Sequence, residues 1–151
     1  MKKKKIHKRR KDSSNIRKEN ASEMIRNIAD EFISMGDTIE RRQCYLNLAC
    51  AAWNISLLPV DQRGDAINDY INAMMKLNNR WTDQDTNGTF RNMNIFISDK
   101  IKYYPKVNRI IVRAELTVVD GKEQLTVASV NMDKISQSNY RLKPTAAAGT
   151  A

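Results

Sequence analysis

The sequence predicts an α+β protein: three or four N-terminal helices, a small helical bundle, are followed by a C-terminal antiparallel β-hairpin packed on them. Three observations lead to this fold class. Apolar residues recur at helical spacing between Met24 and Tyr104, a two-residue alternation begins at Arg109, and the dipeptide Asp120-Gly121 interrupts that alternation as a hairpin turn does. The helices therefore come first and the hairpin last.

A basic segment precedes the helices. Residues 1–18 hold ten of the 26 Lys and Arg residues and one of the 17 acidic ones, so they carry the whole formal charge of +9 and positions 19–151 are neutral. A run of like charges repels itself and resists folding. We predict a disordered basic arm over 1–19, a single α+β domain over 20–131 and a flexible C-terminal tail over 132–151, where the apolar period is lost.

The first helix is expected at about 21–35. Asn20, followed three residues later by Glu23, has the pattern of an N-cap with a capping-box acid, and Gly36 is placed just past the helix end. Asp37 and Glu40 repeat the capping pattern and should open a second helix.

The second helix should run until Pro59 stops it. From Tyr45 onward it is apolar nearly all the way round, which predicts a central position in the fold. A third helix is expected at roughly 60–78 and a loop at 79–89. Residues 90–104 fit either a fourth helix ending at Pro105 or a strand, and their length favours the helix.

The hairpin follows from Arg109 onward. Asp120-Gly121 predicts a type I′ turn between its two strands. One face of the first strand should be apolar and lie on the helices, and it comprises Ile110, Val112, Ala114, Leu116 and Val118.

The cysteines and the hydropathy pattern indicate in which cellular compartment the protein is expected. Cys44 and Cys50 lie six residues apart on a predicted helix, point to different faces and are expected to be reduced core residues. The longest apolar region, LACAAWNISLLPV, is too short and interrupted for a transmembrane segment, and no secretory signal follows the arm. We expect a cytoplasmic protein, or a nuclear one in a eukaryote.

The arm is the first candidate site. Lysine and arginine side chains neutralise phosphates and release condensed counterions, which gives salt-dependent binding that does not read the nucleotide sequence. A solubilising tail, a dock for an acidic protein and a nuclear-import signal have the same composition. The predicted contacts to RNA or DNA are Lys2, Lys3, Lys4, Lys5, Lys8, Arg9, Arg10 and Lys11.

Arg80 and Trp81 form a second candidate contact to nucleic acid. Trp81 lies in a polar segment, where it can stack on a base or a partner side chain or fold back to cover the helical core, and the second use is the commoner one.

Residues 83–94 resemble the calcium loop of EF-hand proteins over twelve residues. Asp83, Asp85 and Asn87 occupy the first, third and fifth positions, but Asn94 stands where a bidentate glutamate should close the shell. The resemblance implies weak calcium binding at most and no membership of that family. The other interpretation is an Asx-rich turn.

Enzyme chemistry has little support in the sequence. The only histidine, His7, lies in the arm, the glycines are isolated, and no nucleotide-binding motif occurs. Asp65 and Asp69 lie one helical turn apart but fit a solvated helix face. We expect no catalytic residue and no cofactor.

These observations predict a small non-enzymatic binding or adaptor protein. Its arm would contact RNA or DNA while the neutral helical body makes a specific protein contact. The alternative is a protein-interaction or oligomeric assembly subunit with no direct role in nucleic-acid binding, and a third possibility is weak calcium binding through 83–94.

Overall fold

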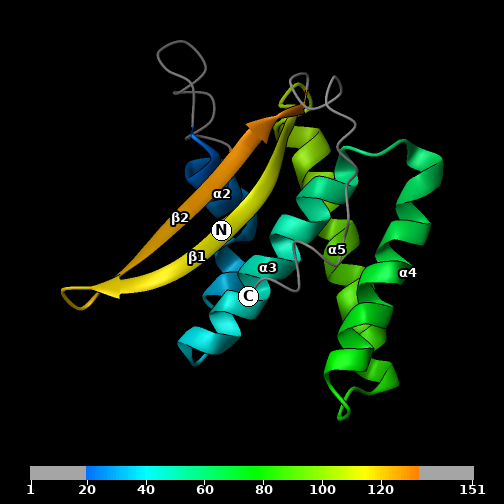
Figure 1. The fold of residues 1–151 in the computed structure, drawn as a ribbon, viewed down its shortest axis with the longest axis horizontal. Coiled ribbons are helices and arrows are strands. Elements are labelled where there is room, and N and C mark those ends of the chain that lie inside the picture. The colour runs from blue at the N-terminus through cyan, green and yellow to red at the C-terminus, as the bar shows by residue number, and fades with distance from the viewer. Residues whose placement is uncertain (1–19, 133–151) are drawn as a thin grey trace.

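Four helices followed by a two-stranded antiparallel hairpin make up the described part of the chain (Figure 1). A computed structural model describes residues 20–132. In chain order the elements are α2 (Ala21–Ile33), α3 (Ile39–Ser56), α4 (Val60–Leu77), α5 (Asp83–Tyr103), β1 (Arg109–Val119) and β2 (Lys122–Asn131). The predicted α+β fold class is confirmed. The predicted arm, and the predicted tail beyond Met132, lie outside the described residues.

The helices begin where short polar side chains can cap them. Asn20 caps α2 by accepting a hydrogen bond of 2.9 Å from the Glu23 N–H, as predicted. The cap of α3 is Thr38, whose hydroxyl accepts from the Arg41 N–H, so the predicted cap at Asp37 is wrong by one residue. Each cap thus gives one first-turn amide group of its helix a hydrogen-bond partner.

Helix α5 is the longest element, and it includes most of the segment predicted to be a loop. The loop expected at 79–89 is wrong from Asp83 onward, because Thr82 and Asp85 form a capping box that starts a helix there. Gly88 lies inside this helix and does not take a positive φ. The helical interpretation of 90–104 is confirmed.

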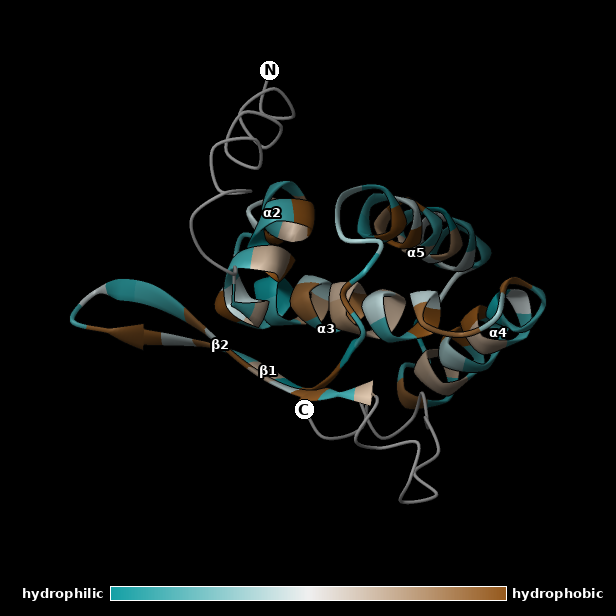
Figure 2. Cartoon of the chain, turned by 90° about the horizontal axis from the view of Figure 1, so that it is seen from above, coloured by the Kyte–Doolittle hydropathy of each residue, from teal (hydrophilic) through white to brown (hydrophobic). Residues whose placement is uncertain are grey.

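Helix α3 is the centre of the fold, as predicted. Figure 2 shows α2 and α5 on one side of α3 and the hairpin on the other, with α4 beside it. Trp53 is fully buried on α3, and its ring lies near that of Tyr104, which follows α5. Across the core Phe32 of α2 meets Phe96 of α5 edge to face, with ring centroids 4.8 Å apart.

A β-bulge at Val112 sets the register of the hairpin. Ile111 pairs with Ser129 and Arg113 pairs with Ala128, so Val112 is the extra residue in β1. The extra residue shifts the alternation of inward and outward side chains along β1 by one position, so the residues that pack on the core are odd-numbered before the bulge and even-numbered after it. Ile111, Ala114 and Leu116 pack on the core, whereas Val112 and Val118 are 40% and 58% exposed.

The inward face predicted for β1 is therefore correct at Ile110, Ala114 and Leu116 and wrong at Val112 and Val118, which are exposed. Ile110 is buried, but it lies outside the hydrophobic core cluster. The turn is as predicted, since Asp120 and Gly121 both have positive φ, at 52° and 74°.

Candidate functional site

The edge of β1 that faces away from β2 lies against a polar stripe on α3. The stripe consists of Gln43, Asn47, Cys50 and Asn54, which are spaced four, three and four residues apart and so share one helix face. A strand edge presents N–H and C=O groups that need partners. Carboxamides can supply both a donor and an acceptor, and this explains polar residues on a helix that is largely apolar from Tyr45 onward.

Asn54 hydrogen-bonds the backbone groups at one end of this edge. Its Nδ2 donates to the Ile111 carbonyl at 2.9 Å and its Oδ1 accepts from the Ile111 N–H at 2.8 Å. One residue exchanging two bonds with another is the pattern of an antiparallel ladder. The neighbouring Trp53 indole donates to the Arg109 carbonyl at 2.8 Å. This end of β1 is thus fixed to α3 by three hydrogen bonds.

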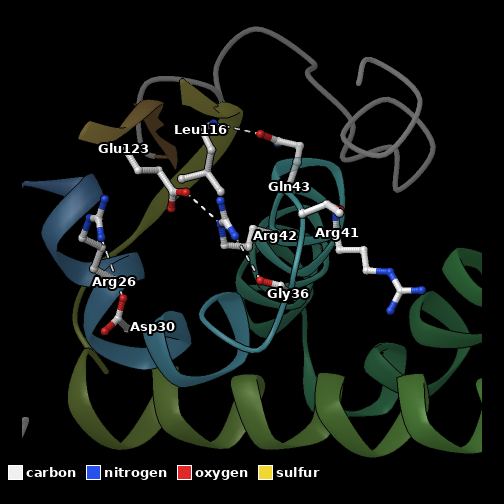
Figure 3. A network of polar contacts seen from close by, with 9 residues as sticks. Arg26, Asp30, Gly36, Arg41, Arg42, Gln43, Leu116 and Glu123 are labelled. Carbon is white, nitrogen blue, oxygen red and sulfur yellow. Dashed lines mark hydrogen bonds and ion pairs between the residues drawn. The ribbon is translucent and has the colours of Figure 1, made fainter. Parts of the chain in front are cut away.

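Gln43 hydrogen-bonds backbone groups in the middle of the edge. Its Nε2 donates to the Ala114 carbonyl at 3.0 Å. Its Oε1 accepts from the Leu116 N–H at 2.8 Å, as Figure 3 shows. The same Nε2 donates to Asn47 Oδ1 at 2.8 Å on its own helix. In the described part of the chain Asn47 makes no hydrogen bond to β1.

A groove of about 590 Å³ lies between this stripe and the strand. Its volume is within the usual range for ligand sites. Seven consecutive strand residues form one wall, and Gln43, Asn47 and Cys50 form the other; the strand wall is Ile111–Thr117. Such a wall measures roughly 20 Å at the rise of an extended strand, so the groove is elongated along β1.

The chemistry of the groove is that of hydrogen bonding rather than proton transfer. Carboxamides do not titrate, and burial raises the pKa of the Cys50 thiol from 9.0 to about 12. A thiol with that pKa stays protonated at neutral pH and is a poor nucleophile. The strand wall of the groove also carries the exposed ion pair of Arg113 with Glu115.

A second polar cluster holds the turn end of the hairpin (Figure 3). Arg42 Nε donates to Glu123 Oε2 of β2 at 2.7 Å, and its Nη1 donates to the Gly36 carbonyl at 3.0 Å. A Cβ atom at Gly36 would lie 2.7 Å from the Arg42 backbone nitrogen. The absence of a side chain at Gly36 lets the α2–α3 connection approach Arg42 closely enough for this contact.

Lys100 is a buried cation at the end of α5. Its residue is 3% exposed, its Nζ donates to the Val107 carbonyl at 2.7 Å, and it lies 5.3 Å from the centre of the Trp53 ring. Burial, and then the nearby Arg63 charge, lower the pKa of Lys100. These contacts indicate a structural role, in which Lys100 joins α5 to the segment before β1.

The predicted second contact, Arg80 and Trp81, lies in the connection between α4 and α5. Arg80 is exposed. Trp81 is half-buried, packs against the core and donates its indole N–H to Thr86 at 2.7 Å. This placement favours the interpretation in which Trp81 covers the core. The eight predicted arm residues lie outside the described ones.

The predicted calcium ligands Asp83, Asp85 and Asn87 all lie in the first turns of α5. Residues two apart on a helix point about 200° apart around its axis, so the required loop is not formed. The Asp85 carboxylate accepts instead from the Thr82 N–H at 2.9 Å. Within residues 20–132 no group of three or more His, Cys, Asp or Glu side chains could hold a metal ion.

Comparison of the chain with family models, curated proteins and solved structures found no match. The helices of residues 20–132 include none with the length and apolar character needed to cross a membrane.

The groove was not found by reasoning from the sequence. Gln43, Asn47 and Asn54 interrupt an apolar helix at a regular spacing, and that regularity was the available signal. The spacing could not identify the strand edge as the partner, because the bonds from Gln43 and Asn54 to β1 join residues 57 to 73 positions apart.

Proposed function

We propose that this chain is a small non-enzymatic binding or adaptor protein. Its N-terminal arm contacts RNA or DNA phosphates without reading their sequence, and its helical body makes a specific protein contact. The observation that carries the proposal is the partition of charge. Residues 1–18 hold the entire formal charge of +9, while the described body has thirteen basic and fourteen acidic side chains. Attraction to a polyanion is therefore assigned to the arm.

The body supports the second half of the proposal through the groove along β1. Its wall offers backbone groups and carboxamides, which bind by hydrogen bonding and shape. The thiol that lines it, that of Cys50, is kept protonated by burial. These features favour a binding surface over a catalytic one.

The test compares the full chain with residues 19–151 in binding a labelled 20-nucleotide RNA and a duplex DNA of equal length. Affinity of the full chain for the RNA should fall with salt with a logarithmic slope of roughly −6 if the eight arm cations each contact a phosphate. The truncated chain should bind neither polymer measurably. A chain whose arm residues are scrambled in order is the matched control, and it should bind as tightly as the natural sequence. Equal binding by residues 19–151 would refute the arm assignment.

A second candidate function, self-association or assembly without a nucleic-acid role, is favoured by apolar side chains on the body surface. Met35, Val60 and Leu77 are 68%, 76% and 72% exposed. Solution mass measured with and without residues 1–18 separates the two functions. An oligomer that persists without the arm, together with no nucleic acid bound at moderate salt, would favour assembly.

A further inference from the structure

We infer that the groove between α3 and β1 binds an extended peptide segment as an added β-strand along the edge of β1 from Ala114 to Val118. Gln43 occupies part of the place that this strand would take. The inference deepens the protein contact proposed for the body and rests on that proposal. It assigns the partner chemistry: main-chain amides and carbonyls in extended conformation.

The first argument is the bonding pattern of Gln43. A single carboxamide donates to Ala114 and accepts from Leu116, and this is the pair of bonds that one residue of a parallel neighbouring strand makes. The side chain thus imitates a peptide group. A real strand can make the same two bonds and continue along the edge.

The second argument is the number of backbone groups at that edge. In an antiparallel ladder the N–H and C=O of one residue point the same way. The Ala114 N–H and the Leu116 carbonyl therefore also face the groove side. Val118 has the same orientation, lies beyond the last bond from α3, and is 58% exposed. Three strand residues in register thus offer donors and acceptors to one incoming chain.

The third argument is that Gln43 has a second partner. Its Nε2 already donates to Asn47 Oδ1 at 2.8 Å, so on leaving β1 it keeps that bond. The bonds that it gives up at Ala114 and Leu116 are remade by the incoming strand. Displacing Gln43 therefore costs little, and the remaining cost is that of any association, namely the lost freedom and the desolvation of the peptide.

The shape of the site favours a chain over a compact ligand. The groove follows seven consecutive residues of β1, about 20 Å of strand, against only two turns of α3. Asn54 and Trp53 close the Ile111 end, where the bonded groups are buried. Entry is consequently from the Val118 end, toward the turn.

The probe is a capped ten-residue peptide with the sequence of Lys122–Asn131, which is extended in the folded chain, although there it pairs antiparallel with the opposite edge of β1. Its control is the same peptide with alternate backbone amides methylated, which removes donors. The full-length chain, labelled with ¹⁵N, is titrated with each. The unmethylated peptide should shift the amide resonances of Ala114, Leu116 and Val118 and slow their hydrogen exchange, and the methylated one should not.

A variant sharpens the test. Gln43→Ala removes the competing carboxamide and should bind the peptide about fivefold more tightly, which corresponds to one ordinary hydrogen bond. Asp65→Ala, an exposed position on α4, is the matched control and should bind as the natural chain does.

Three outcomes would overturn the inference: no shifts with either chain at millimolar peptide, equal binding of the methylated peptide, or shifts confined to the β2 amides. RNA binding is measured on the same samples. Salt-dependent RNA binding without peptide binding refutes the groove assignment and leaves the arm proposal standing, whereas peptide binding without RNA binding does the reverse.

Discussion

The Asn54 carboxamide and the Ile111 backbone exchange two hydrogen bonds of 2.9 and 2.8 Å, so a helix side chain completes the ladder at the edge of a two-stranded sheet. A hairpin of two strands is marginal in isolation. Here the edge facing α3 is paired by side chains instead of by a third strand. The stability of β1 therefore depends on the carboxamides of α3.

Replacing Asn54 with Ala should lower the free energy of unfolding by about 2–4 kcal/mol. The Ile111 N–H and C=O are buried, and each loses its partner. Urea unfolding measures the change. The matched control is Asn47→Ala on the same helix face, which breaks no bond to β1. Equal losses from the two substitutions would show that the Asn54 bonds contribute no stability of their own.

Deleting Val112 should destabilise the fold by about 2–5 kcal/mol, whereas Val112→Ala should cost less than about 1 kcal/mol. Deletion removes the bulge and turns the residues before it over, so that Ile111 leaves the core. The substitution keeps the register and trims a side chain that is 40% exposed. Thermal melts of both variants test this. If the deletion variant melts at the same temperature as the natural chain, the bulge does not set the register.

Two glycine substitutions should act in opposite directions. Gly36→Ala places a Cβ 2.7 Å from the Arg42 nitrogen and should destabilise the fold by about 1–3 kcal/mol as the Arg42 contacts shift. Gly64→Ala, inside α4 with nothing within 4 Å, should stabilise it by about 0.5–1 kcal/mol. Chemical denaturation of both variants measures the two changes in the free energy of unfolding. A stabilising effect of Gly36→Ala would contradict the close approach of Gly36 to Arg42.

The Cys50 thiol should make the fold less stable at alkaline pH. Its pKa is raised to about 12 in the folded chain, so above pH 9 the unfolded thiol ionises first and proton release favours unfolding. The free energy of unfolding should fall by up to about 1.4 kcal/mol per pH unit between pH 9 and 12 from this group. Cys50→Ala should remove that slope and Cys44→Ala, at an exposed site, should keep it.

Lys100 should have the opposite pH dependence. Its pKa is lowered by burial, so as pH rises through the folded pKa toward 10.5 the folded chain loses its proton before the unfolded chain does. This group therefore contributes stability that increases with pH in that window. Lys100→Met should abolish the increase, and the exposed Lys102→Met should retain it. Denaturation at a series of pH values between 8 and 10.5 provides the measurement.

Local sequence patterns predicted most of the fold. Caps, prolines and apolar stripes located the helices to within a few residues, and Asp120-Gly121 located the turn. The start of α5 was missed because Asp83, Asp85 and Asn87 suit a loop and a helix N-terminus equally well. The capping box with Thr82 decides for the helix.

The bulge and the groove depend on contacts that no local pattern specifies. Ile110, Ile111 and Val112 are all β-branched and apolar, so the alternation cannot show which one is extra. The edge pairing needs α3 and β1 in one place, and those elements are separated by α4 and α5 in the chain. Only the assembled fold reveals it.

The bonds from α3 to β1 also constrain the order in which contacts can form while the chain is being synthesised. They join residues separated by 56 to 73 positions, so α3 leaves the ribosome well before the strand that satisfies it. Until residue 119 has emerged, the carboxamides of Gln43 and Asn54 face water or any extended chain nearby. Docking of the hairpin is thus a late event, and a nascent chain that ends before β1 presents α3 as an unoccupied acceptor for a strand.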